Sequence, residues 1–394
     1  MMANMRPFRD LVANQYDEEN NKTHSSKEQI DVEKSVLNMY ESAHMKITLN
    51  RNLPRLATNA HMDFIRDGLT QLPHSYSCLD ASRTWLCYWS LHSMSLLTDI
   101  SKTWPLNKEE SMIVQFLSKC QHPSGGFGGG PGQYPHLATT YAAVNALCII
   151  GTQEAYDIIN RKTLKEFLYS VRAPNGAFRM HLDGEIDVRG VYCALSIATL
   201  TGIYSEKLFD GTAEWVVSCQ TYEGGFSGCP GLEAHGGYTF CAIAVLTILK
   251  RPKLCDLHSL LRWLVNKQMK LEGGFQGRTN KLVDGCYSFW LACSVLLAGV
   301  ALGEKKMLFN QTALQEYIMV CCQYNSGGLL DKPGKRPDLY HTCYTLSGLS
   351  LTQTNSDYIG IPFYLGFINP LYNISYEKVE IMKTYFKDTK DETL

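Results

Sequence analysis

The chain has 394 residues, of which 45% are hydrophobic, and a formal net charge of -1. A chain of this length can bury a large core as one or two domains. Because a nearly neutral chain offers no basic stripe to neutralise phosphates, its charge argues against nucleic acid as a partner.

The 14 cysteines stand mostly inside apolar runs, as Cys193, Cys241 and Cys293 do. Neither a secretory signal nor a run of about 18 uncharged apolar residues precedes them. We therefore expect a reduced, cytoplasmic protein without a transmembrane segment, whose thiols are mainly small core residues.

The ends of the chain differ from its middle. Residues 1–28 are polar and lack apolar periodicity, which predicts a mobile N-terminal tail or an arm lying on a partner. Helical spacing begins near Ile30 and continues through residues 57–72 and 79–97. We expect one barrel domain over 29–374, followed by a C-terminal helix and charged tail over 375–394. Trp85 and Trp89 lie one helical turn apart, a spacing that is typical of core packing.

An internal repeat of roughly fifty residues begins near Glu110 and indicates the fold. Each unit has a helix with one apolar stripe, a glycine turn followed by an apolar residue, a polar linker, and a second helix that is apolar nearly all round. The turns are 125–127, 176–178, 224–226, 273–275 and 327–329. The two kinds of helix belong to different layers, and no terminal repeat shows a polar capping face. The pattern predicts an all-α fold, an α/α barrel with inner and outer rings.

The inner helices should bring their N-terminal ends to one rim. Aligning the repeats on Tyr141, Tyr192, Tyr238, Tyr287 and Tyr344 places Ala138, Arg189, His235, Asp284 and His341 in one register, three residues upstream. Asp284, Cys286 and His341 then meet as carboxylate, thiolate and imidazole, which are zinc ligands with a fourth position left open. In this alignment Cys343 shares the register of Cys286 and is a rival ligand.

A second constellation stands beside the predicted metal site. His235, Arg278, Lys281 and Tyr287 combine positive charge with hydrogen-bond donors, a combination that suits a diphosphate. The alternative interpretation of the two basic residues is a solvated loop. Tyr192, Tyr238, Cys241 and Trp290 would give the inner wall an aromatic and apolar surface, although each also suits core packing.

Several motifs together closely resemble the β subunits of protein farnesyltransferases, which belong to the protein prenyltransferase family. They are the repeated Gly-Gly-Phe turns, GGGPGQYPH (128–136), EAHGGY (233–238), QGR (276–278), KLVDGCY (281–287) and YHTCY (340–344). The similarity runs from about residue 75 to residue 350 and is far more specific than any single motif.

The resemblance implies a reaction and a partner. It implies one Zn²⁺ on Asp284, Cys286 and His341, with the fourth position taken by the cysteine of a protein's C-terminal Cys-a-a-X sequence. That thiolate would attack C1 of farnesyl diphosphate, and a lysine of an obligate α subunit would help the diphosphate to leave. Asp331 matches a family residue thought to bring Mg²⁺ to the leaving group.

The resemblance also assigns the walls of the site. The farnesyl diphosphate would contact Arg189, Tyr192, His235, Tyr238, Cys241, Arg278, Lys281, Tyr287 and Trp290. The peptide would contact Ser82, Trp85, Trp89, His136, Ala138 and Tyr340. Trp85 and Tyr344 would limit the length of the isoprenoid. Thr139 stands where the family usually has proline, and this departure leaves the preference for X open.

Three other functions remain to be weighed. A geranylgeranyltransferase type I β subunit has the same fold, but a small residue replaces the tryptophan that Trp85 matches. A triterpene cyclase needs a D-x-D-D motif, which does not occur here. A non-enzymatic toroid that acts as a binding module would not need three ligand residues in repeat register. Neither a G-x-G-x-x-G nor a Walker A sequence is present to suggest nucleotide binding.

Overall fold

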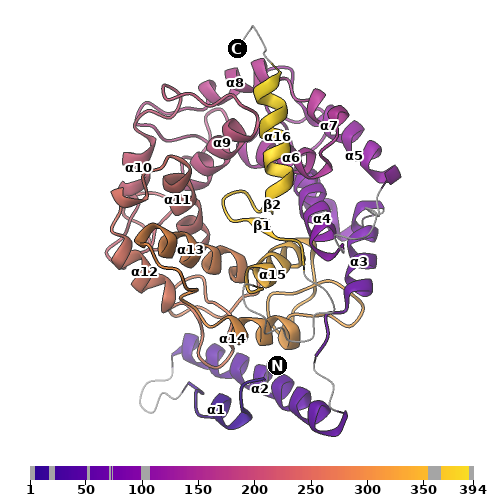
Figure 1. The fold of residues 1–394 in the computed structure, drawn as a ribbon, viewed down its shortest axis with the longest axis vertical. Coiled ribbons are helices and arrows are strands. Elements are labelled where there is room, and N and C mark those ends of the chain that lie inside the picture. Colours follow the sequence, from indigo (N-terminus) through magenta and orange to yellow (C-terminus); the bar gives the residue numbers. More distant parts are fainter. Residues whose placement is uncertain are drawn as a thin grey trace.

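Helices of two kinds alternate along the chain and close into a ring (Figure 1). The structure, a computed structural model, describes residues 5–16, 23–50, 54–70, 72, 74–98, 107–353 and 365–389. The inner helices are α4 (Arg83–Leu97), α6 (Leu137–Ile150), α9 (Val188–Leu200), α11 (Gly236–Ile248), α13 (Tyr287–Leu302) and α15 (Leu339–Leu351). Each packs against the next in this order, and α15 packs against α4. The predicted α/α barrel is therefore confirmed.

The outer helices surround the inner ring. They are α3 (Thr58–Thr70), α5 (Asn107–Cys120), α8 (Arg161–Ser170), α10 (Thr212–Ser218), α12 (Leu257–Val265) and α14 (Gln311–Glu316), which continues as a π-helical turn, Tyr317–Cys321. Shorter pieces are the 3₁₀ segments His74–Ser82 and Pro252–Leu254 and helix α7 (Gln153–Asp157). Inner helices are buried on nearly all sides, whereas an outer helix such as α12 buries one stripe. This is the division between layers that the sequence predicts.

The predicted turns join each outer helix to the following inner one. The first glycine of every turn has a positive φ, and the apolar residue that ends the turn is fully buried. At Gly224 a Cβ atom would lie 2.1 Å from the carbonyl oxygen of Ser259 in α12. Glycine is thus required there twice, for its left-handed backbone and for the close approach of the next outer helix.

Glutamine side chains before the turns connect successive repeats. The amides of Gln121, Gln220 and Gln268 donate to the carbonyls of Ile158, Asp256 and Asn310, each at 2.9 Å. Gln323 in the last repeat donates instead to Arg55, at 3.2 Å, and accepts from the backbone of Ala57 at the start of α3. The same side chain that links neighbours therefore also closes the ring.

The N-terminal segment lies outside the ring, below it in Figure 1. Helix α1 (Phe8–Val12) packs against α2 (His24–Asn50), and Met5 and Leu11 are buried. Residues 1–28 are expected from the sequence to form a mobile tail or an arm lying on a partner. In their described part, these apolar side chains and the ion pair between Arg6 and the buried Glu316 connect the segment to the barrel. Residues 1–4 and 17–22 lie outside the described residues. The ring itself begins at α3 and not at residue 29.

The C-terminal segment enters the ring. Strands β1 (Ile368–Asn369) and β2 (Ile374–Ser375) form an antiparallel hairpin at the centre of the ring, and α16 (Tyr376–Asp388) runs from there to the rim (Figure 1). The predicted C-terminal helix is present, and residues 390–394 of the predicted tail are outside the described part. Among the described helices, none is long and apolar enough to cross a membrane.

Candidate active site

The inner helices begin at equivalent points of the repeat. The backbone N–H groups of His136, His235, Asp284 and Asp338 each donate to the carbonyl of the last turn residue, at 3.2, 2.9, 3.0 and 3.4 Å respectively. The side chains of these residues and of Asp187 then accept from N–H groups in the first turn of the helix. Two residues after these caps stand Ala138, Arg189, Gly237, Cys286 and Tyr340. The caps therefore define the true register of the rim.

This register corrects the alignment on tyrosines. Tyr141 and Tyr192 lie five residues after their caps, Tyr238 and Tyr287 three, and Tyr344 six. Cys286 therefore lies two residues after its cap and Cys343 five, so the two cysteines are not equivalent. Cys343 is fully buried inside α15. The cap residues, and the hydroxyl four residues later in most repeats, are the sequence signal that identifies the register.

The predicted metal ligands come together. One ligand atom from each of Asp284, Cys286 and His341 lies within 4.8 Å of the others, and across the described residues this is the sole group of its kind. His341 Nε2 is 3.3 Å from Asp284 Oδ1, and its Nδ1 is 2.7 Å from Asp338 Oδ2. Asp338, which we did not predict, thus turns Nε2 toward the cluster. Such a second partner is usual for a histidine that binds a metal.

The ionisation of the cluster follows from its burial and charge. Burial disfavours the charged imidazole of His341, but hydrogen bonds with Asp284 and Asp338 outweigh it and raise the pKa to about 10. Burial and the Asp284 carboxylate raise the pKa of the Cys286 thiol well above its usual range. Without a metal, both groups therefore hold protons that a divalent cation would replace. Oxygen, sulfur and nitrogen donors in a set of three fit a zinc ion with an open fourth position.

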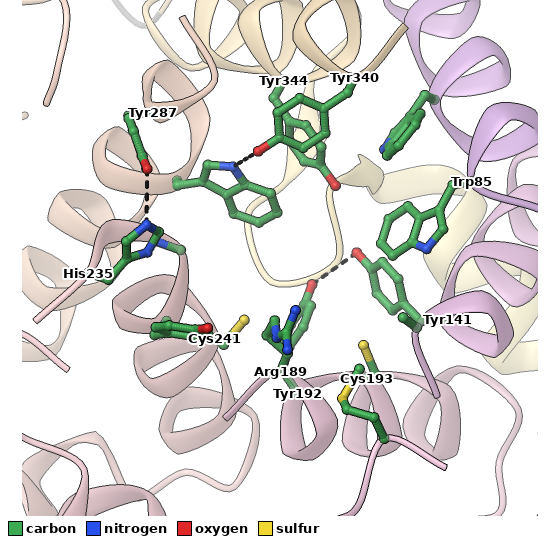
Figure 2. A pocket seen from close by; sticks show the side chains of 16 residues that line it. Trp85, Tyr141, Arg189, Tyr192, Cys193, His235, Cys241, Tyr287, Tyr340 and Tyr344 are labelled. Atoms are coloured by element: carbon green, nitrogen blue, oxygen red, sulfur yellow. Dashed lines mark hydrogen bonds between the residues drawn. The ribbon is translucent and has the colours of Figure 1, made fainter. Parts of the chain in front are cut away.

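A cavity of about 400 Å³ opens beside this cluster, inside the ring (Figure 2). Tyr287, which follows Cys286 in the chain, and Tyr340, which precedes His341, both line it. Of the other predicted residues, the lining includes Trp85, Trp89, Ala138, Arg189, Tyr192, His235, Tyr238, Cys241, Trp290 and Tyr344. Tyr141, Met180, Cys193 and Gly237 also line it and were not predicted. The predicted isoprenoid residues and four of the six predicted peptide residues therefore share one largely aromatic cavity.

The polar end of the cavity has a defined hydrogen-bond direction. His235 Nδ1 accepts from the backbone N–H of Gly237 at 3.0 Å, so the proton of a neutral ring lies on Nε2. Burial and then the charge of Arg278 lower the pKa of His235, which favours that neutral ring. Its Nε2 lies 3.1 Å from the Tyr287 hydroxyl. Because Nε2–H donates to the phenol oxygen, the phenol proton is free to donate to an anion in the cavity.

Arg189 is held in place on the neighbouring inner helix, α9. Its guanidinium donates two hydrogen bonds to Asp187, at 3.0 and 2.6 Å, and lies 5.8 Å from the centre of the Tyr238 ring. We did not predict a role for Asp187. Its position in the sequence, two residues before Arg189 and at the start of α9, could have indicated it.

Some predicted residues lie elsewhere. Arg278 pairs with Glu233 at 3.0 Å and does not line the cavity, and the exposed Lys281 borders a separate hollow beside the N-terminal segment. Asp331 pairs with Lys332, while burial and then the charge of Asp284 raise the pKa of Asp331.

Two predicted peptide residues also lie outside the lining of the cavity. Ser82 precedes α4 without a capping hydrogen bond, and His136 caps α6, with its ring centre 5.4 Å from that of His181. The structure thus brings together the three candidate metal ligands and the aromatic cavity. Of the four residues predicted to bind the diphosphate, only His235 and Tyr287 line that cavity.

The sequence is similar to those of protein prenyltransferase β subunits. Residues 56–378 match the family model described as the prenyltransferase alpha-alpha toroid domain. The protein farnesyltransferase β subunit of Arabidopsis thaliana is 38% identical over 392 residues, covering 84% of this chain and 80% of the relative. That of Pisum sativum is 43% identical, covering 69% and 78%.

Similarity to geranylgeranyltransferases is lower. The type-1 β subunit of Arabidopsis thaliana is 31% identical, covering 74% of this chain and 84% of the relative. A solved structure of Candida albicans protein geranylgeranyltransferase-I complexed with GGPP has a TM-score of 0.70 and 26% identity, and it covers 84% of this chain and 98% of that one. The farnesyltransferase β subunits thus match this sequence better than the geranylgeranyl type-1 relative does.

Proposed function

The chain belongs to the family of protein farnesyltransferase β subunits, and from that premise we propose that it holds a zinc-dependent site for farnesylating a C-terminal Cys-a-a-X sequence. The main support for this proposal is that the three candidate metal ligands lie at the edge of the aromatic cavity. The residues next to two of the ligands, Tyr287 and Tyr340, are themselves cavity walls. A thiol beside the cluster and a prenyl chain in the cavity would therefore meet.

Asp284, Cys286 and His341 would hold the zinc ion, whose charge keeps a thiol in the open fourth position as the thiolate near neutral pH. Asp338 supports this arrangement by fixing His341. In the reaction the substrate sulfur forms a bond to C1 of the farnesyl chain while the bond from C1 to the diphosphate oxygen breaks, and the diphosphate leaves with that electron pair.

The leaving diphosphate is received by the polar end of the cavity. Tyr287, whose pKa is raised by burial, stays protonated and donates from its free O–H. His235 orients that phenol through its Nε2. Arg278 and Lys281 would also bind the diphosphate, once Arg278 has broken its ion pair with Glu233. Asp331 would bind a Mg²⁺ ion after breaking its ion pair with Lys332. We also propose an α-subunit partner that completes this end of the site, and a cytoplasmic location.

The aromatic walls select the substrate. Tyr192, Tyr238, Cys241 and Trp290 offer an apolar path for the isoprenoid, with Trp85 and Tyr344 limiting its length. Trp85, Trp89, Ala138 and Tyr340 are the predicted peptide residues that reach the same cavity. A geranylgeranyl chain remains the second candidate, since a solved relative carries one. The bulk of Trp85 inside the cavity favours the shorter chain.

The proposal is tested with the chain purified together with its α-subunit partner. Transfer to a Cys-a-a-X peptide is followed with farnesyl diphosphate, before and after removal of metal by a chelator and after addition of zinc. We expect transfer that disappears with the chelator and returns with zinc. Full transfer by the metal-free complex would contradict the proposed role of the cluster.

A further inference from the structure

The loop between β1 and β2 is seated in the ring by several inner helices at once. Residues 370–373, which we call the plug, present four successive backbone carbonyls, and each accepts a hydrogen bond from a side chain of a different inner helix. The pairs are Cys293 of α13 to Pro370 at 3.1 Å, Tyr192 of α9 to Leu371 at 2.9 Å, Tyr141 of α6 to Tyr372 at 3.4 Å, and Tyr88 of α4 to Asn373 at 3.0 Å. The plug thus has a fixed position relative to the ring.

Asn373 secures the end of the plug. Its φ is +52°, a left-handed conformation that asparagine tolerates better than most residues. Its side-chain oxygen lies 3.1 Å from His92 Nε2, which is also 3.1 Å from the hydroxyl of Ser347 in α15. Asn373 is 1% exposed and does not line the cavity. Asn373 therefore connects the end of the plug to α4 and, through His92, to α15, without forming part of the cavity wall.

Two of the residues that hold the plug are also walls of the cavity. Tyr141 and Tyr192 line the cavity, and their hydroxyls lie 3.2 Å apart (Figure 2). Tyr141 also packs on Trp85, with ring centres 5.7 Å apart. Because each hydroxyl has a buried carbonyl as partner, neither ring can turn aside without leaving a buried polar group unpaired.

We propose that the plug is a positioning element for chain-length selection: by holding the hydroxyls of Tyr141 and Tyr192, it fixes the deep wall of the isoprenoid cavity. This rests on the proposed function, because the cavity is taken to hold a prenyl chain. The choice between farnesyl and geranylgeranyl chains then depends on the position of the plug as well as on the size of the side chains that line the cavity. In the wild-type cavity, a prenyl chain with one more isoprene unit must displace Trp85 or a tyrosine whose hydroxyl is held by the plug.

The test substitutes a residue outside the cavity. Asn373→Ala removes the bond to His92 and strains the left-handed backbone, which loosens the plug. Lys250→Ala is the matched control, because Lys250 also has a left-handed φ, +59°, but is exposed and lies outside the cavity lining. Tyr192→Phe is the second variant, since it removes the bond to Leu371 and keeps the ring.

The measurement is equilibrium binding of farnesyl and geranylgeranyl diphosphates to the complex with the α subunit, followed by the fluorescence of the cavity tryptophans. We expect Asn373→Ala and Tyr192→Phe to shift the ratio of the two affinities toward the longer chain by about three- to tenfold, the effect of one hydrogen bond. Lys250→Ala should leave the ratio unchanged.

Unchanged ratios in both plug variants, with the wild-type complex binding farnesyl diphosphate, would overturn the role of the plug alone. A wild-type complex that binds neither diphosphate would overturn the proposed function as well.

Discussion

At the scale of single residues, hydrogen bonds decide which atom of each side chain faces a ligand. Asp338 holds Nδ1 of His341, and the backbone of Gly237 holds Nδ1 of His235, so both rings present Nε2 to the site. Asp187 holds Arg189 in the same way. That Asp284, Cys286 and His341 lie together could be predicted from the sequence, because their chemistry as candidate metal ligands is distinctive. Their partners could not, because a cap is defined by where a helix begins.

The choice of ligand cysteine is directly testable. Cys286→Ala should remove the bound zinc and nearly all transfer to peptide, while farnesyl diphosphate still binds through other residues. Cys343→Ala should keep its zinc, since Cys343 is buried within α15 and outside the cluster. Metal analysis of the two purified complexes checks this. Zinc lost from the Cys343 variant and kept in the Cys286 variant would show that the wrong thiol was chosen.

Trp85 should limit the isoprenoid. Trp85→Thr removes an indole from the cavity lining, so an extra isoprene unit could enter. Burial of five more carbons is favourable by roughly 0.8 kcal/mol per carbon before strain and imperfect packing are counted. We expect use of geranylgeranyl diphosphate to rise by one to two orders of magnitude, with farnesyl transfer retained.

Competition between the two diphosphates for one peptide measures this, with Tyr344→Phe as a control that loses only a hydroxyl. An unchanged preference in a folded, zinc-containing Trp85→Thr complex would make Trp85 a peptide or core residue only.

At the scale of elements, the repeat was predictable and its register was not. Glycine turns at a fixed spacing identify the outer and inner helices, because a left-handed backbone at a tight approach admits little else. Aligning the repeats on their tyrosines gave the wrong register, because the tyrosines that reach the cavity occupy different positions on their helices. Cap residues such as His235 and Asp284 give the register, because they bond to the turn of their own repeat.

The two demands on a turn glycine can be separated by experiment. Gly224 and Gly231 both have a positive φ, but a Cβ atom on Gly231 would meet nothing within 4 Å. Gly231→Ala should therefore lower the free energy of unfolding by about 1 kcal/mol, the cost of the backbone alone. Gly224→Ala should lower it by about 3 kcal/mol or more, because the outer helix must also shift. Urea unfolding of both variants measures the difference, and equal losses would show that the close approach to Ser259 does not matter.

The buried Glu272, which contacts the N-terminal segment, should make the free energy of unfolding depend on pH. Glu272 is 1% exposed and accepts a hydrogen bond from Gln29 of α2 at 2.8 Å. Burial raises its pKa from 4.5 to about 7. Folding therefore favours the protonated form of Glu272. The stability that this form contributes to the folded protein is fully present below pH 4.5 and is lost as the pH rises through 7.

Glu272→Gln should remove this dependence. At pH 8 the variant should be more stable than the wild type, by up to about 2 to 3 kcal/mol, and the difference should shrink toward pH 5. Denaturant unfolding at both pH values provides the measurement. Parallel pH profiles for the two proteins would mean that Glu272 is not the titrating group.

At the scale of the whole molecule, the ring depends on contacts between distant parts of the sequence. Gln323 repeats at the junction with α3 the bond that its counterparts make between neighbours. Closure could be predicted, because no repeat carries a polar capping face. The N-terminal segment and the plug could not, because neither belongs to a repeat. Both are instead fixed by contacts outside the repeat pattern, such as the ion pair of Arg6 with Glu316 and the hydrogen bond of Tyr192 with Leu371.

The central claim is that a substrate thiol joins a metal held by Asp284, Cys286 and His341. X-ray absorption at the zinc edge counts sulfur ligands directly, in the complex of this chain with its α subunit. We predict one sulfur ligand with farnesyl diphosphate alone and two after a Cys-a-a-X peptide is added, with a serine-containing peptide leaving one. Two sulfur ligands before any peptide, or no change when the cysteine peptide binds, would contradict the claim.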